Sequence, residues 1–173
     1  MLQLSLLRHA KTELGHALLA DFDRPLAERG RRDAPRMAAY MRAEGVAPDL
    51  VLCSTAQRTR QTLELVLEAL VADARGPRIV FDHGLYLAES AALLGRIQRV
   101  TPAVGHVMVI GHNPGLHELA LRLAGKGPAA DLTRLAAKFP TAALAVITFV
   151  EADWRHVAVG RGLLEHFAVP RQL

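Results

Sequence analysis

Three short apolar runs in this chain each end in polar residues that are suited to contact an anion. Runs of this length, bounded by polar residues, are typical of strands that are buried on both faces of a parallel sheet. Ligands bind outside the carboxyl ends of the strands in such sheets, so we expect the polar residues to share one edge. The runs and the residues after them are 4–7 with Arg8 and His9, 50–53 with Ser54, and 107–110 with Gly111 and His112.

A second guanidinium group would reach this edge from Arg58, which lies in the first turn and a half of the helix expected after Ser54. Together with Arg8, it would supply donors that match phosphate oxygens in bidentate geometry. A helix start expected at Asn113 and Pro114 would also favour an anion. A single Arg-His pair is more often a packed histidine beside a surface ion pair, but three converging strand ends predict a phosphoryl site.

Strand and helix patterns alternate along the chain, which predicts an α/β three-layer sandwich in a single domain, residues 1–173. The central sheet should be mostly parallel, with helices on both faces and a late antiparallel edge strand. A polar loop is expected at 11–25 and a further strand at 78–81. The remaining elements expected are a helix at 26–44, a helix up to about residue 72 with a capping box at Ser54 and Gln57, a shorter helix within 86–100 that starts near Ser90, a helix with Asn113 as N-cap up to about residue 124, an irregular or partly helical stretch at 125–139, and a closing hairpin of 144–150 and 154–160.

Length and composition exclude several classes of protein. The 173 residues, 51% of them hydrophobic, are enough to bury the core of one domain and do not suit a disordered chain. No apolar run approaches the ~20 residues that cross a bilayer, and the apolar start is too short for a signal peptide and ends at Arg8. The single cysteine, Cys53, excludes an internal disulfide framework and gives no metal-site spacing. We therefore expect a cytoplasmic protein with no membrane partner and no metal.

The net charge of +4 suits anionic partners, namely phosphorylated molecules, acidic proteins or nucleic acid. Aromatic residues are few and are not interleaved with basic ones, which argues against single-stranded nucleic acid. The run of Arg29, Arg31 and Arg32 is typical of a solvated helix face, and its alternative role is to steer an acidic protein partner.

Several motifs resemble those of the histidine phosphatase superfamily, and together they span almost the whole chain. Each motif is weak alone, but several in this order and spacing are specific. In order of appearance the motifs are Arg8-His9-Ala10, then Arg24-Pro25-Leu26 with Gly30, Ser54-x-x-x-Arg58-Thr59-x-Gln61-Thr62, Gly111-His112-Asn113-Pro114, and Phe139-Pro140-Thr141-Ala142. The second and the last fit the short bacterial branch typified by phosphohistidine phosphatases. Ala10 replaces the usual glycine and Thr55 stands where proline is common, but neither change removes a reactive group.

The resemblance implies a covalent route without a cofactor. His9 would attack phosphorus in line, and water would then hydrolyse the phosphohistidine enzyme. A backbone carbonyl in the polar loop is expected to fix the tautomer of neutral His9. Arg8 and Arg58 would neutralise the phosphoryl oxygens, and His112 would act as a donor or cation. The resemblance thus implies that His9, Arg8, Arg58 and His112 act in catalysis at one edge of the sheet. It also implies that Asn113 lies beside the substrate.

Two further residues have alternative interpretations. The resemblance places Arg24 at the substrate, whereas its neighbours Asp21 and Asp23 favour an exposed ion pair. Glu89 lies in the region after the third strand where relatives acting on alkyl phosphates carry a general acid, but it also suits a helix N-terminus. A phosphohistidine substrate needs less acid assistance, because the leaving imidazole can depart with its other nitrogen already protonated.

The functional hypotheses differ in substrate. The first is a phosphatase that acts on phosphohistidine in a protein, and the absence of the insertions that form a lid in sugar-phosphate members favours such an exposed substrate. The alternatives are a phosphatase of a small phosphorylated metabolite (a sugar or nucleotide phosphate) and a phosphate-recognition module without turnover. A mutase is disfavoured because it must exclude water from its intermediate. The other histidines, expected at the surface or in the core, are His16, His83, His106, His117, His156 and His166.

Overall fold

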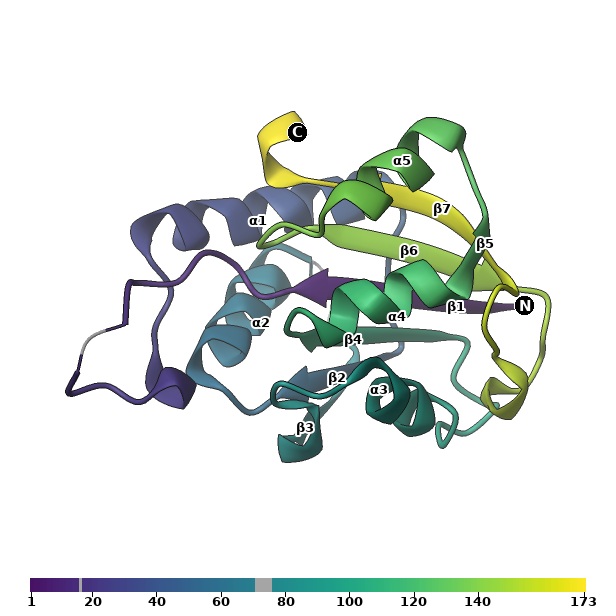
Figure 1. Ribbon diagram of the computed structural model, residues 1–173, viewed down its shortest axis with the longest axis horizontal. Coiled ribbons are helices and arrows are strands. Elements are labelled where there is room, and N and C mark those ends of the chain that lie inside the picture. The colour runs from purple at the N-terminus through teal and green to yellow at the C-terminus, as the bar shows by residue number, and fades with distance from the viewer. Residues whose placement is uncertain (16, 71–75) are drawn as a thin grey trace.

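The computed structural model describes residues 1–15, 17–70 and 76–173. Over these residues the chain forms a mixed sheet with helices on both faces, in the strand order β3-β2-β4-β1-β6-β7-β5 (Figure 1). The strands are β1 Leu2–Arg8, β2 Leu50–Ser54, β3 Arg78–Asp82, β4 His106–Gly111, β5 Ala124–Lys126, β6 Leu144–Phe149 and β7 Gly162–Ala168. The α-helices are α1 Glu28–Ala43, α2 Gln57–Leu70, α3 Ser90–Ile97, α4 Gly115–Leu123 and α5 Ala129–Ala137.

The predicted α/β class with a mostly parallel sheet is confirmed. Strands β1 to β4 run parallel to one another, and β6 is antiparallel to both of its neighbours, β1 and β7. The expected edge position of the late antiparallel strand is wrong, because β6 lies inside the sheet and the edges are β3 and β5. Among the described ranges, no helix is both long and apolar enough to span a membrane.

The last strand lies later in the chain than the sequence pattern predicts. The expectation of a strand at 154–160 is wrong, because Trp154–His156 forms a 3-10 turn and the partner of β6 is β7. Trp154 is fully buried, and its indole N–H donates to the carbonyl of Val104 at 2.7 Å. Residues 125–139, expected to be irregular or partly helical, form the short strand β5 and helix α5. The expected extension of α2 to residue 72 falls outside the described residues.

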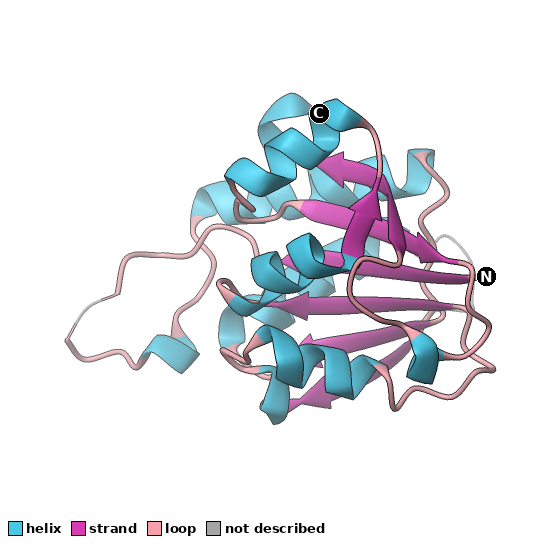
Figure 2. Ribbon diagram, turned by 45° about the vertical axis from the view of Figure 1, so that its right-hand side comes forward, coloured by secondary structure: helices cyan, strands magenta, loops and turns pink. Residues whose placement is uncertain are grey.

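Alternating residues of the central strands divide the core into two layers. One layer packs Leu4, Leu6 and the equivalent positions of the other strands against α3, α4 and α5. The second layer packs Leu7 and its equivalents against α1 and α2. Because both faces are covered, these strands are continuous apolar runs, as expected for a buried parallel sheet. The fold is thus the predicted three-layer sandwich, with helices in front of and behind the strands in Figure 2.

The strand register brings the carboxyl ends of β1, β2 and β4 to the same edge of the sheet. Arg8 pairs with Gly111 across β1 and β4, and Cys53 pairs with Ile110 across β2 and β4. The residues that follow, His9, Ser54 and His112, therefore leave the sheet side by side. The chain between β1 and α1 extends from this edge (Figures 1 and 2).

Candidate active site

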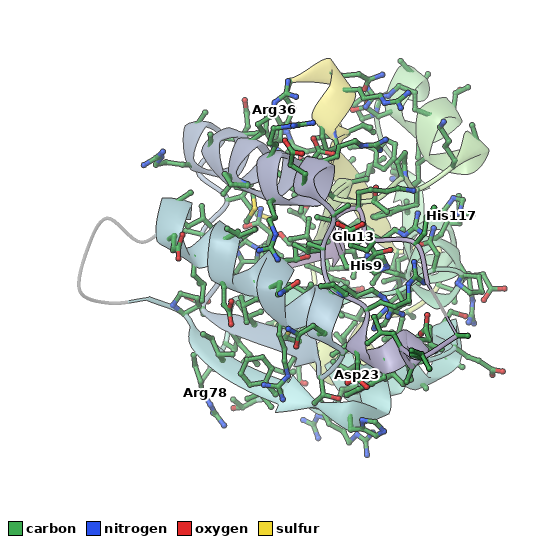
Figure 3. The ribbon with its side chains drawn as sticks, turned by 90° about the vertical axis from the view of Figure 1, so that its left-hand side faces the viewer. His9, Glu13, Asp23, Arg36, Arg78 and His117 are labelled. Carbon is green, nitrogen blue, oxygen red and sulfur yellow. The ribbon has the colours of Figure 1, made fainter. Side chains whose placement is uncertain are left out.

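His9 and His112 meet beyond the ends of the two central strands. Their ring centroids are 5.4 Å apart with an interplanar angle of 51°, and the backbone N–H of His9 donates to the carbonyl of Gly111. In a view onto this edge, His9 lies near the middle of the molecule, and Arg36 and Arg78 lie at its periphery (Figure 3). The predicted convergence of the two imidazoles is confirmed.

The ring of His9 is held in one tautomer by its neighbour. Its Nδ1 lies 2.8 Å from the carbonyl oxygen of Ala10, which can only accept, so Nδ1 carries the proton and Nε2 carries the lone pair. The side chain is only 7% exposed. Burial, with the nearby imidazole and guanidinium groups, lowers the pKa of His9 to about 3. His9 is therefore neutral at pH 7, with an available lone pair, as expected of a nucleophile.

Ser54 orients the second imidazole. The Nε2 of His112 lies 2.7 Å from Ser54 Oγ, and the Ser54 hydroxyl oxygen also accepts a long bond from the N–H of Ala56 at 3.5 Å. Among the described residues Nε2 is the one acceptor within reach of the buried Ser54 hydrogen, so the hydroxyl donates to Nε2, which places the His112 proton on Nδ1. Burial and the charge of Arg58 lower the pKa of His112 to about 4. The capping box expected at Ser54 is wrong, because Ser54 ends β2 and α2 begins at Gln57 itself.

Asn113 contacts the chain ahead of β6. Its Nδ2 donates to the carbonyl of Phe139 at 2.9 Å, so the N-cap role expected for it is wrong. Helix α4 begins at Gly115 with Pro114 as its N-cap, and the bond between Asn113 and Pro114 is cis. Asn113 is thereby fixed beside His112, where it stays a candidate substrate contact.

The Phe139 carbonyl also holds the first arginine of the site. Arg8 Nη1 donates to it at 3.0 Å, and the N–H of Ala142 lies within bonding distance of the carbonyls of Arg8 (3.1 Å) and His9 (3.0 Å). Residues 139–142, which we call the clamp loop, thus bind both the Arg8 side chain and the backbone at the end of β1. Burial and the charge of Arg58 lower the pKa of Arg8.

Three buried polar atoms of the site lack a hydrogen-bond partner among the described residues: Arg8 Nε, His112 Nδ1 and Asn113 Oδ1. Two of these are donors, since an arginine Nε always carries a proton and the Ser54 bond leaves one on His112 Nδ1. Buried donors without partners cost free energy, which an anionic ligand would recover. The arrangement therefore suits an anion better than a cation or a neutral ligand.

Arg58 approaches the site from the first turn of α2 and is 4% exposed. Its Nη1 donates to the backbone carbonyl of Asp21 at 2.7 Å, and its Nη2 pairs with the Asp21 carboxylate at 3.0 Å. Tyr86 donates to the same carboxylate oxygen at 2.6 Å. Hydrogen bonds from Tyr86, Arg24 and Arg58 lower the pKa of Asp21 to about 2. Asp21 stays ionised at neutral pH, so it orients Arg58 and does not serve as a proton donor.

Thr62, the last residue of the second motif, connects α2 to the chain after β1. Its hydroxyl donates to the carbonyl of Arg58 at 2.7 Å and accepts from the N–H of Ala10 at 3.0 Å. The bonds from Tyr86, Asp21 and Thr62 were not anticipated from the sequence. For Thr62 the signal was present, because it lies one helical turn after Arg58 and therefore on the same face.

Arg24 lies in the loop between β1 and α1 and forms the ion pair that its acidic neighbours favoured, with Nη1 at 3.1 Å from Asp21 Oδ1. Its Nη2 also donates to Thr12 Oγ1 at 2.7 Å and to the carbonyl of Glu13 at 2.9 Å. Arg24 therefore ties the loop to the carboxylate that orients Arg58. A direct contact between Arg24 and substrate stays a prediction.

Glu89 is exposed and precedes α3, without a side-chain bond to the start of that helix. Its backbone lies close to the site, because the preceding carbonyl, that of Ala88, packs against Gly115. A Cβ added to Gly115 would come 1.9 Å from that oxygen. Glu89 is therefore near the start of α4, although its side chain forms no hydrogen bond or ion pair with any of the described residues.

The remaining histidines have structural surroundings. His106 is buried against Ser5, His117 bonds to the carbonyl of Leu135, and His166 contacts Tyr40. His16 lies outside the described residues. Within the ranges that the structure covers, no group of three or more His, Cys, Asp or Glu side chains is arranged to hold a metal ion.

Comparison with known proteins agrees with this geometry. Residues 4–84 match the family model of the histidine phosphatase superfamily (branch 1). The chain is 40% identical to the uncharacterized protein Rv1276c of Mycobacterium tuberculosis over 167 residues, which cover 95% of this chain and 100% of the relative.

Two solved structures named SixA share the fold. One, assigned as the phosphohistidine phosphatase SixA of Agrobacterium tumefaciens, is 33% identical, with a TM-score of 0.81 over 98% of both chains. The other, the protein histidine phosphatase SixA complexed with tungstate, is 25% identical, with a TM-score of 0.77 over 99% of both chains. The sequence motifs, the site at the sheet edge and these likenesses agree, and the chain belongs to the histidine phosphatase superfamily.

Proposed function

We propose that the protein hydrolyses phosphohistidine in a phosphorylated protein through a covalent intermediate on His9. The observation that carries this proposal is the neutral His9 ring, whose Nε2 lone pair is available because Nδ1 donates to Ala10. The lone pair of Nε2 forms the new bond to phosphorus, and the bond from phosphorus to the substrate imidazole breaks. The departing nitrogen keeps the electron pair, and the imidazole leaves as a neutral ring because its other nitrogen is already protonated.

The arginines and His112 would stabilise the transferring group. Arg8 and Arg58 place two guanidinium groups at this edge, and positioned charge is the main source of rate in phosphoryl transfer. Water then attacks phosphorus, the bond to His9 Nε2 breaks, and phosphate leaves with neutral His9 restored. The names of the two SixA structures and the short connection of residues 83–89 between β3 and α3 support an exposed protein substrate.

The test is to trap the intermediate with a labelled phosphohistidine peptide. We expect a labelled enzyme that is acid-labile and alkali-stable, as a phosphoramidate bond is, and His9→Ala should abolish both label and turnover. His156→Ala, a replacement of an exposed histidine, is the matched control and should retain both. Unchanged turnover in His9→Ala would refute the proposal, whereas binding of the peptide without turnover by the wild type would favour a recognition module.

A second candidate, a phosphatase of small phosphomonoesters, is favoured by the position of Glu89 near the start of α4. An alkoxide leaving group needs a proton, and general acid catalysis is worth about 10²-fold or more. If the alternative holds, Glu89→Gln should lower turnover of a phosphomonoester by about this factor. Under the main proposal, the same variant should hydrolyse the phosphohistidine peptide at nearly the wild-type rate.

A further inference from the structure

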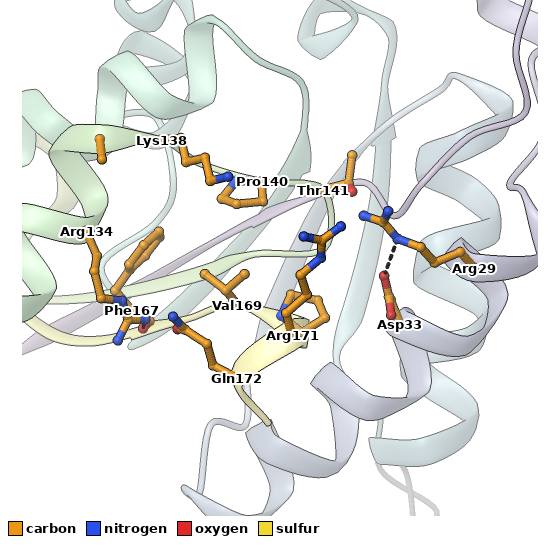
Figure 4. A pocket seen from close by; sticks show the side chains of 12 residues that line it. Arg29, Asp33, Arg134, Lys138, Pro140, Thr141, Phe167, Val169, Arg171 and Gln172 are labelled. Atoms are coloured by element: carbon orange, nitrogen blue, oxygen red, sulfur yellow. Dashed lines mark hydrogen bonds and ion pairs between the residues drawn. The ribbon is translucent and has the colours of Figure 1, made fainter.

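A pocket of about 350 Å³ lies where the start of α1, the end of α5, the clamp loop and the C-terminal residues meet (Figure 4). The charged residues of its lining are mostly cationic. Four basic residues and one acid contribute to it, namely Arg29, Arg134, Lys138 and Arg171, with Asp33. The lining therefore has a charge of +3, which favours an anionic occupant.

Two of these cations have no acidic partner in the described parts of the chain. Arg29 pairs with Asp33 at 3.4 Å and Arg134 with Asp131 at 3.1 Å, whereas Lys138 and Arg171 form no such pair. Both are exposed, so their charges meet the solvent at the pocket rim. Figure 4 shows the guanidinium groups of Arg29 and Arg171 directed toward the same opening. A carboxylate placed there would relieve the repulsion between them.

Apolar side chains form a second part of the lining, and one of its walls is preorganised. Phe167, Val169 and Pro140 are among the residues that line it. The guanidinium of Arg134 lies 5.3 Å from the centre of the Phe167 ring and donates to the Phe167 carbonyl, so this wall is fixed. A small hydrated anion gains nothing from such a surface, whereas an apolar side chain beside a carboxylate would bury area against it.

The pocket and the candidate active site share the clamp loop. Lys138 and Pro140 flank Phe139, whose carbonyl binds Arg8 and Asn113 of the site. Thr141, which also lines the pocket, precedes Ala142, which bonds to the backbone at His9. A chain that presents its phosphorylated residue to His9 can therefore continue across the clamp loop into the pocket.

We propose that this basic pocket docks an acidic segment of the phosphorylated partner protein, in which a carboxylate stands next to an apolar side chain. The proposal rests on the proposed function for its partner, a phosphoprotein. It assigns substrate selection to a surface beside the reacting residues and predicts that small phosphodonors bypass it.

The test compares synthetic peptides that carry one phosphohistidine and, at a series of spacings from it, either a Glu-Leu or a Gln-Leu pair. The wild type should show a kcat/KM about tenfold higher for the Glu-Leu peptide at the spacing that reaches the pocket. Lys138→Glu and Arg171→Glu should abolish this preference through KM, without changing turnover of phosphoramidate. Arg78→Glu makes the same charge change on β3, at the opposite edge of the sheet, and should keep the preference.

Failure of this proposal is distinguishable from failure of the proposed function. Equal kcat/KM for the two peptides at every spacing, or a preference that survives both pocket variants, would overturn the docking site while hydrolysis continues. If no phosphohistidine peptide is hydrolysed, the docking site can still be tested by fluorescence anisotropy with the labelled unphosphorylated Glu-Leu peptide. Binding that is lost in Arg171→Glu and weakens with added salt supports the pocket, and no binding overturns it.

Discussion

Ser54 is the residue on which the orientation of His112 depends. Its hydroxyl is the partner of Nε2, and Nδ1 is among the buried atoms without a partner in the described residues. Ser54→Ala would leave both ring nitrogens of a buried imidazole unsatisfied, so the ring can turn. We expect kcat to fall about fivefold, in line with the ~1 kcal/mol typical of one hydrogen bond, with His9 still labelled. The measurement is single-turnover kinetics, and a full rate in Ser54→Ala would show that the hydroxyl does not position His112.

Asp21 makes a different contribution, because it fixes a charged group rather than a neutral one. Asp21→Asn keeps the backbone carbonyl that binds Arg58 Nη1 but removes the ionic partner of Nη2. We expect kcat/KM to fall about tenfold for all phosphodonors, since a charge-assisted hydrogen bond is worth ~1.5–3 kcal/mol and one of two contacts remains. Asp23→Asn changes an exposed neighbouring carboxylate and is the control. Equal losses in the two variants would point to a general effect of loop charge.

For individual residues, the sequence could predict which side chains are reactive, but not which groups hold these side chains in position. His9, His112 and Arg8 follow apolar runs and were predictable from that position. Asp21 reaches Arg58 only because the loop after β1 folds back over α2, and no periodic pattern encodes such a path. The Phe139 carbonyl is a backbone group, which every residue type supplies equally.

Helix α1 packs closely at Gly30 against the loop that follows β1. A Cβ at Gly30 would lie 2.1 Å from the carbonyl oxygen of Lys11, two residues after His9. An alanine in a helix normally stabilises it by ~0.5–1 kcal/mol relative to glycine. Here the added methyl group would push α1 and the backbone at Lys11 apart. Gly30→Ala should therefore lower both the free energy of unfolding, measured by denaturant unfolding, and the turnover, measured by steady-state kinetics.

Gly95→Ala is the matched control for this substitution. Gly95 also lies inside a helix, α3, and a Cβ there would have no heavy atom within 4 Å. This variant should gain up to ~1 kcal/mol in the free energy of unfolding and keep full activity. A stabilising Gly30→Ala would show that Lys11 can move without cost, and α1 would then not position the loop.

Strands that consist of one continuous apolar run were predictable from the sequence, whereas the last strand was not. The continuous apolar runs of β1, β2 and β4 allow only a buried interpretation. Residues 154–160 contain an aromatic and two β-branched residues, which favour a strand locally. The side chain of Asp153 instead accepts from the N–H of Arg155 and pairs with its guanidinium, which closes a turn. Local side-chain bonds of this kind compete with the ladder of a sheet.

The folded protein keeps buried histidines neutral, so its free energy of unfolding must depend on pH. His9 has a pKa of about 3 in the folded protein, below its ordinary value of 6.5, because burial disfavours the charged ring. Between these two values the unfolded chain binds a proton that the folded protein does not. The free energy of unfolding therefore falls as the pH falls from 6.5 toward 3, by on the order of 1.4 kcal/mol per pH unit for this group.

His9→Gln tests this linkage, because glutamine does not titrate and can still donate to the Ala10 carbonyl. The wild type should lose stability more steeply than His9→Gln when denaturant unfolding is measured between pH 6.5 and pH 4.5. His156→Gln, which replaces an exposed histidine, is the control and should follow the wild type. Parallel curves for the wild type and His9→Gln would mean that His9 is protonated in the folded protein at pH 4.5. A cationic ring has no lone pair with which to attack phosphorus, so kcat/KM would then have to decline over the same range rather than stay level toward pH 4.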